Sequence, residues 1–348
     1  MMQGRTLQGL ALELERQRAA KADYLADTRE LTMAPEAGGN RLYMGGTALN
    51  INEVAHGQIA DKTGIPLKYY KRMLNDQPEL LARNVNTWFR QEPETRMLRT
   101  LDGTARAMLS DRYRRIDNAE IAEAVLPLIA DMPGATVESC ELTDRRMYLK
   151  VLNPRVQAEI AKGDVVQSGL LISNSEVGCG SVSVMPLIYR LVCSNGMIAA
   201  DSGQRKFHIG RVNESGDNYQ VFRSVTIEAE DKAFILKLQD IVRATADTIQ
   251  FERIASVMKI AADAKITSQD VPKAVHLASK AFGLTETEGK GVLGHLIRGA
   301  DLSLYGLANA VTREAQDVQN YDRSTELEMT GWNMMSMSRA DWKRINAD

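Results

Sequence analysis

The stretch that most constrains the fold runs from residue 163 to residue 198. It is dense in β-branched residues and interrupted by glycines, a pattern typical of long paired strands. Asn174-Ser175 and Ser194-Asn195-Gly196 have the chemistry of turns, and the Asn195-Gly196 pair is a strong hairpin signal. We therefore expect these strands to form the centre of a mostly antiparallel sheet.

A β-β-α-β-β unit is predicted before this segment. Residues 95–110 indicate a hairpin that turns at Asp102-Gly103, a pair favoured in type I′ turns. Asn118 is expected to cap a helix that ends at Pro133-Gly134. Two further strands follow, with their turn at Thr143-Asp144.

The first 75 residues mix helices and strands. An amphipathic helix is predicted over residues 6–22, and one or two strands over residues 28–46. Residues 56–74 have the spacing of a helix-turn-helix, with Gly64 in the turn and Pro66 at the start of the second helix. Such a hairpin is either a DNA-reading unit or an ordinary packing unit.

After Gly216 the sequence becomes helical in period. We predict an α+β protein in which a central mostly antiparallel sheet is followed by a helical C-terminal region. The predicted domains are a mixed α/β core over residues 1–215, a helical region over 216–332 and a flexible tail over 333–348.

Composition narrows the class of protein. The 348 residues carry a net charge of −2 and include three cysteines, which give neither a disulfide framework nor zinc spacing. The N-terminus lacks the apolar core of a signal peptide, and no window reaches the roughly 18 apolar residues that a membrane span needs. We expect a cytoplasmic protein with no membrane contact.

Positive charge is concentrated in residues 96–115, where six arginines face two acids. Alternate positions of paired strands share a face, so these side chains can gather there. Phosphate-binding charge beside an aromatic ring suits single-stranded nucleic acid. The alternative is a solvated hairpin paired with nearby acids. The candidates are Arg96, Arg99, Arg106, Arg112, Tyr113, Arg114 and Arg115.

Two smaller basic clusters surround aromatic residues. In the first, Tyr70 and Met73 are expected in the core, which leaves Lys68, Lys71 and Arg72 as candidates. The second lies around Phe207 and has the composition of a phosphate-contacting loop. Its candidates are Arg205, Lys206, His208 and Arg211.

The second part of the chain has the opposite charge. Residues 225–330 hold sixteen acids against twelve lysines and arginines. A basic first part and an acidic second part reconcile a near-neutral chain with nucleic-acid binding. They also permit head-to-tail association between subunits.

Enzyme chemistry finds little support in the sequence. The four histidines lie far apart without metal-ligand spacing, and no phosphate-binding GxxxxGK[ST] loop occurs. Gly178-Cys179-Gly180 opens no helix, so dinucleotide binding fails, and strand cysteines such as Cys179 or Cys193 are usually inert. We predict no catalytic residues, no metal and no cofactor.

Three motifs resemble a known family: SDRYRRIDNAEI (110–121), GLLISNSEVGCGSVSV (169–184) and YRLVCSNGMI (189–198). In this order they resemble the phage/plasmid-like proteins of domain of unknown function 932, over roughly residues 40–310. The resemblance implies a protein of a mobile element. The mixed sheet followed by long helices is similar, by architectural analogy, to single-strand annealing proteins of the RecT and Erf type.

The leading hypothesis is therefore an ATP-independent protein that binds and anneals single-stranded DNA in phage or plasmid recombination. It would act as a homo-oligomer, a ring or a filament. A protein-binding module without DNA activity, an anti-host-defence or assembly factor, is the alternative. A nucleic-acid-processing enzyme would need a metal site that the sequence does not show.

Overall fold

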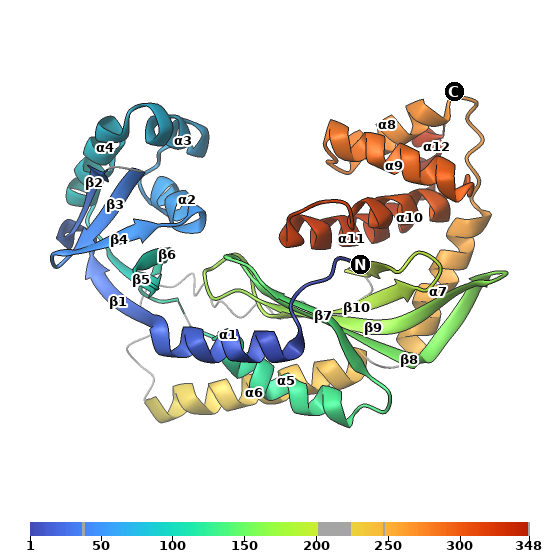
Figure 1. The fold of residues 1–348 in the computed structure, drawn as a ribbon, viewed down its shortest axis with the longest axis horizontal. Helices are drawn as coiled ribbons and strands as arrows, with labels where there is room; N and C mark the ends of the chain where they lie inside the picture. The colour runs from blue at the N-terminus through green and yellow to red at the C-terminus, as the bar shows by residue number, and fades with distance from the viewer. Residues whose placement is uncertain (37–38, 114, 201–223, 246–247, 347–348) are drawn as a thin grey trace.

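The computed structural model describes all residues except 37–38, 114, 201–223, 246–247 and 347–348. The described residues form two β-sheets surrounded by helices, which confirms the α+β class. Figure 1 shows the N-terminal lobe and the C-terminal helices at opposite ends, with the second sheet between them.

The N-terminal lobe is built on a six-stranded sheet with the order β1-β5-β6-β4-β3-β2. Only β4 and β6 pair in parallel. The strands are β1 Lys21–Asp27, β2 Leu31–Glu36, β3 Gly39–Met44, β4 Thr47–Ile51, β5 Thr95–Leu101 and β6 Thr104–Ser110. A 3-10 turn, Thr28–Glu30, joins β1 to β2.

Three helices cover this sheet: α2 Glu53–Lys62, α3 Leu67–Asp76 and α4 Pro78–Gln91. The predicted helical hairpin is α2 and α3, and Gly64 in its turn has a φ of +64°. Tyr70 and Met73 are buried in the lobe's core, as expected. Helix α4 was not predicted from the sequence, and its Leu81 and Phe89 complete that core.

The β5–β6 hairpin turns where it was predicted. Asp102 and Gly103 have φ angles of +50° and +71°. Positive φ at both central residues is the requirement of a type I′ turn, whose twist matches that of the strands. The Asp-Gly prediction is confirmed.

The second sheet has five strands in the order β11-β10-β9-β8-β7, all antiparallel. These are β7 Thr136–Leu142, β8 Met147–Ala161, β9 Asp164–Asn174, β10 Ser183–Arg190 and β11 Asn195–Ile198. The β-rich stretch supplies the central strand β9, as predicted. The hairpin before β11 turns at residues 191–194, with Ser194 in the left-handed conformation. Of the predicted turn residues, Ser194 therefore lies in the turn, whereas Asn195 and Gly196 already belong to β11.

The β-β-α-β-β order is present, and its two hairpins lie in different sheets. Between them lies α5, Asn118–Asp131, which packs with α1, Leu7–Ala20, and α6, Ser224–Thr245. These helices cover one face of the five-stranded sheet (Figure 1), where Leu149 and Val151 point into their core.

The C-terminal helices cover the opposite face. They are α7 Thr248–Asp263, α8 Val271–Ala281, α9 Glu286–Gly299, α10 Leu304–Glu314, α11 Tyr321–Met335 and α12 Arg339–Ile345. Ile188 and Met197 of the sheet share one core with Leu307 and Trp332 of these helices. The core is thus continuous across the boundary predicted near residue 215.

The flexible tail predicted over residues 333–348 is wrong for most of its length. Met334 and Met335 are buried in the last turn of α11, and α12 follows with Ile345 buried. The methionines are core-packing residues at helical spacing rather than a loose connection. None of the helices among the described residues is long and apolar enough to cross a membrane.

Candidate nucleic-acid interface

Arg99, one of the predicted phosphate contacts, lies at the junction of the two sheets with none of its side chain exposed. Its Nε donates to Asp23 Oδ1 at 2.8 Å, and its Nη2 donates to Asp117 Oδ1 at 2.8 Å. Nη1 donates to the backbone oxygen of Glu176 at 2.9 Å. A guanidinium enclosed in this way cannot reach a phosphate, so its predicted role is wrong.

Burial alone raises the pKa of Asp23 and of Asp117 because it penalises a charged carboxylate. At Asp23, the hydrogen bond and positive charge of Arg99 outweigh that effect, with help from Arg115. At Asp117, hydrogen bonds from Lys21 and from Arg99 together outweigh it. The pKa of each aspartate therefore ends below its ordinary value. Arg99 is best explained as the counter-ion that keeps this junction charged and closed.

Arg106 is likewise held by a carboxylate. Its Nη2 lies 2.5 Å from Glu176 Oε2, and only 11% of its side chain is exposed. The other oxygen of Glu176 accepts from the backbone N–H of Asn118 at 2.6 Å. Glu176, in the segment after β9, thus caps the N-terminus of α5. The predicted cap, Asn118, is instead the first residue of the helix.

The rest of the predicted arginine cluster is dispersed. Arg96 binds Glu94 at 2.5 Å, and the exposed Arg115 binds Asp23 at 3.1 Å. Arg112 is exposed and has an interaction partner, while Arg114 lies outside the described residues. The Tyr113 hydroxyl donates to the Ser175 carbonyl at 3.1 Å, so its half-buried ring holds a loop rather than offering a stacking face.

The second basic cluster lies on α3, in the far part of the N-terminal lobe (Figure 1). Lys71 pairs with Glu53, Arg72 lies 3.9 Å from Asp76, and Lys68 is exposed. The third cluster, Arg205, Lys206, His208 and Arg211, lies outside the described residues. Among the described residues, the α3 cluster therefore stays on an element of its own.

A different set of arginines meets in a polar cleft of about 400 Å³ between α1, the β5–β6 hairpin and the β7–β8 turn. Its five arginines come from four separate parts of the chain. They face four acids in the lining, Glu13, Asp102, Asp144 and Glu176. The arginines are Arg5, Arg16, Arg106, Arg145 and Arg146.

Three of these arginines are neutralised by carboxylates. Arg16 binds both Glu13 and Asp102, each at 2.8 Å, and so ties α1 to the tip of the β5–β6 hairpin. Arg5 pairs with Glu141 at 2.7 Å, and Arg106 pairs with Glu176. A ligand could bind these three arginines only by competing with the carboxylates that already pair with them.

Arg145 and Arg146, on the β7–β8 turn, differ from the other three. Within the described part of the chain, neither forms an ion pair with a carboxylate. The Arg146 guanidinium donates to the backbone oxygen of Cys179, and Arg145 lies close enough to the Cys179 thiol to lower its pKa. Because both contacts are with neutral groups, this pair carries the uncompensated positive charge of the cleft.

The Gly178-Cys179-Gly180 segment makes room for this pair. Gly180 has a φ of +134°, and a Cβ there would overlap Arg146 Nη2. Gly178, at +75°, lies against Leu109. The glycines are explained by the approach of a guanidinium and a leucine, not by a dinucleotide. Burial raises the pKa of the Cys179 thiol although both arginines lower it, so the thiol is no activated nucleophile.

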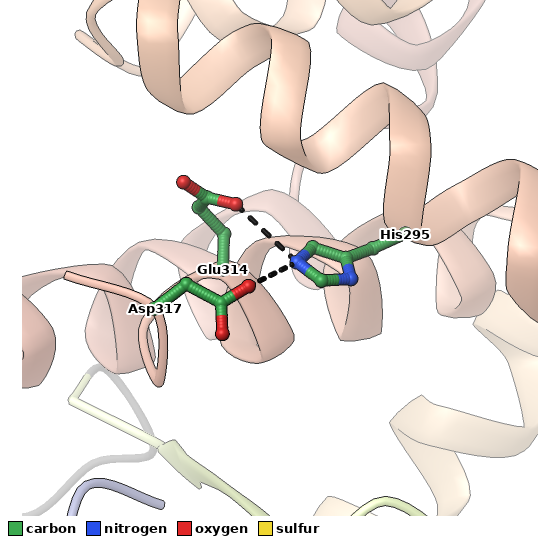
Figure 2. Close-up of side chains that lie close together, drawn as sticks. All are labelled: His295, Glu314 and Asp317. Carbon is green, nitrogen blue, oxygen red and sulfur yellow. Dashed lines mark hydrogen bonds and ion pairs between the residues drawn. The ribbon is translucent and has the colours of Figure 1, made fainter.

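A histidine site also escaped the sequence analysis. His295 on α9 lies beside Glu314 and Asp317 (Figure 2), with Nε2 2.9 Å from Asp317 Oδ2 and 3.3 Å from Glu314 Oε2. His295 and Asp317 are 22 positions apart in sequence. No local motif signals such a pair, since the packing of α9 on α10 creates it.

The fold and the cleft define an α+β protein in which a polar, arginine-lined cleft lies where two sheets meet. A family description, "Domain of unknown function (DUF932)", matches residues 106–341, and the chain belongs to that family. The match starts later and ends later than the resemblance over residues 40–310 suggested, and it leaves out the α2–α3 hairpin. No curated protein and no solved structure matches the chain.

Proposed function

We propose that the protein binds the backbone of single-stranded DNA in the cleft, and that it anneals complementary strands as a homo-oligomer of a phage or plasmid. The observation that supports this most is the Arg145–Arg146 pair, which lines the cleft and forms no ion pair with a carboxylate among the described residues. Guanidinium groups bind phosphate oxygens in a bidentate geometry, which suits a phosphodiester chain.

The lining of the cleft favours contact with the backbone over contact with bases. None of the described residues that line it is aromatic, and Tyr113 is engaged with Ser175. Stacking on aromatic rings is the usual way for proteins to hold single-stranded bases. A protein that grips phosphates alone leaves the base edges free, and free base edges are what pairing with a second strand requires.

Sensitivity to salt tests this proposal. We expect the affinity for a fluorescent 30-nucleotide strand, measured by anisotropy, to fall linearly with salt on a log–log scale. Single strands lose a slope of about 0.7 for each phosphate contact that is removed. The Arg145→Ser, Arg146→Ser double variant should therefore lower the slope by about 1.4 and weaken binding at least about tenfold at low salt.

The control is Lys68→Ser with Arg72→Ser on α3, which removes the same charge at two positions that do not line the cleft. It should bind like the wild type. Equal losses in the two double variants would place the interface elsewhere, and binding that ignores salt would contradict the mechanism. Failure of the wild type to retain DNA, together with co-purification of a host or phage protein, would favour the protein-binding alternative.

Self-association is supported by the edge of the six-stranded sheet. β1 pairs with β5 on one side and forms the sheet's margin on the other, and Tyr24 and Leu25 on it are exposed. Such an edge presents unpaired backbone groups to a second chain. Electron microscopy should show rings or filaments that change when single-stranded DNA is added. Monomers under both conditions would contradict the assembly.

A further inference from the structure

His295, Glu314 and Asp317 are the residues from which we infer a second site, independent of the proposed DNA contact. We propose that they bind one zinc-type divalent cation that joins α9 to the turn after α10 (Figure 2). One imidazole nitrogen and two carboxylate oxygens suit Zn²⁺, whereas Mg²⁺ and Ca²⁺ favour all-oxygen sites.

The spacing of the three donor atoms suits tetrahedral coordination. Bonds of about 2.0–2.2 Å to zinc place neighbouring ligand atoms about 3.3–3.5 Å apart. His295 Nε2 lies 3.3 Å from Glu314 Oε2 and 2.9 Å from Asp317 Oδ2, and the three atoms all lie within 4.8 Å of one another. The hydrogen bond to Asp317 has to open, the contact of Arg298 with the ring has to change as described below, and water would complete the tetrahedron.

Glu314 points to a ligand independently of this spacing. Nine-tenths of its side chain is buried, and no described residue donates a hydrogen bond to its carboxylate. The carboxylate packs so closely on α9 that a Cβ at Gly291 would overlap it. Burying a carboxylate without donors is costly, and a bound cation would remove that cost.

The surrounding charges act in both directions. Burial raises the pKa of Glu314, and the negative charges of Asp317 and Glu288 raise it further, while Arg298 and Arg313 oppose them. Burial also lowers the pKa of His295, while the hydrogen bond and charge of Asp317 oppose that effect. Asp317 itself is half exposed, which leaves the cluster accessible from solvent.

Arg298 is the side chain that competes with a cation. Its Nη2 lies 2.8 Å from His295 Nδ1, and because a guanidinium only donates, Nδ1 accepts and Nε2 holds the ring proton. To bind metal through Nε2, the ring proton must move to Nδ1 and Arg298 must swing away. Glutamine at position 298 could instead accept from Nδ1–H, as the outer partners of metal-bound histidines do.

The test is calorimetric titration of Zn²⁺ into the full chain after removal of metals with a chelator. We expect one equivalent to bind and the unfolding midpoint to rise by about 3–4 °C at 100-fold the dissociation constant. Asp317→Asn should weaken binding at least about tenfold, and Arg298→Gln should tighten it. His276→Ala, which removes an exposed histidine of α8, should leave affinity unchanged.

Cobalt replaces zinc to identify the ligands. Tetrahedral Co²⁺ bands without thiolate charge-transfer bands are expected, and thiolate bands would assign the metal to a cysteine instead. An unchanged affinity in Asp317→Asn, or an equal loss in His276→Ala, would overturn the site. Arg298 is exposed, so the tightening expected for Arg298→Gln does not depend on a variant that unfolds.

Discussion

Replacing Arg99 by methionine is expected to destabilise the protein by about 3–5 kcal/mol, because it removes the enclosed guanidinium that two largely buried carboxylates share and leaves them only Arg115 and Lys21 as partners. Asp23 and Asp117 both accept hydrogen bonds from this guanidinium, which is fully enclosed. Denaturant unfolding measures the loss. Arg96→Met, three residues earlier on β5, is the matched control, since Arg96 is partly exposed and binds only Glu94 among the described residues.

The control should cost at most about 1 kcal/mol, as is usual for an exposed ion pair. Equal losses at positions 96 and 99 would contradict a structural role that is specific to Arg99. If Arg99→Met were instead stable and lost DNA binding alone, Arg99 would act in DNA binding and not in the stability of the fold.

The loss should also depend on pH. Arg99 holds the pKa of Asp23 and Asp117 below their ordinary values, so its contribution is complete above the unfolded pKa of about 4. It disappears as the pH falls through the folded values, because protonated aspartates need no counter-ion. The gap between wild type and Arg99→Met should therefore be widest near pH 7 and shrink below about pH 4.

Replacing Lys150 by methionine is expected to have an effect of similar size. Lys150 on β8 and Glu328 on α11 form an ion pair at 2.6 Å in which neither side chain is exposed. Lys150 also lies 4.7 Å from the centre of the Tyr321 ring. The Oε1 atom of Glu328 has no partner among the described residues, so loss of Lys150 leaves the carboxylate bare, at a cost of about 3–5 kcal/mol.

The double variant Lys150→Met, Glu328→Leu separates this cost from packing. An apolar pair of similar volume commonly replaces a buried ion pair without loss. We expect urea unfolding to show that the second substitution restores most of the stability. A double variant that is as unstable as the two single changes added together would mean that the pair is not coupled.

The elements that local chemistry determines were predictable from the sequence. The type I′ turn at Asp102-Gly103 and the α2–α3 hairpin with Gly64 follow from backbone preferences that act over a few residues. The strands of the second sheet follow from their β-branched content. Of the predicted turn Ser194-Asn195-Gly196, Ser194 does lie in the turn, but local preferences did not show that Asn195 and Gly196 begin a strand.

The candidate site was much less predictable, because charge in a sequence does not show what lies opposite it. Arg99 and Arg106 resemble a basic stripe until Asp23, Asp117 and Glu176 are brought to them from other elements. The sequence did not predict a role for Arg145 and Arg146, because they lie in a short turn beside Asp144. Their accessible charge is a property of the packing around Cys179, not of the local sequence.

The cap that Glu176 places on α5 has a consequence for how the molecule opens. The first turn of that helix is completed by a side chain from the segment between β9 and β10, and the same carboxylate holds a strand of the other sheet through Arg106. Unfolding of the segment that holds Glu176 would leave the backbone N–H of Asn118 and the guanidinium of Arg106 without their partner. The six-stranded sheet and the five-stranded sheet should accordingly unfold as a single cooperative unit, so that a substitution that destabilises one lowers the stability of the other.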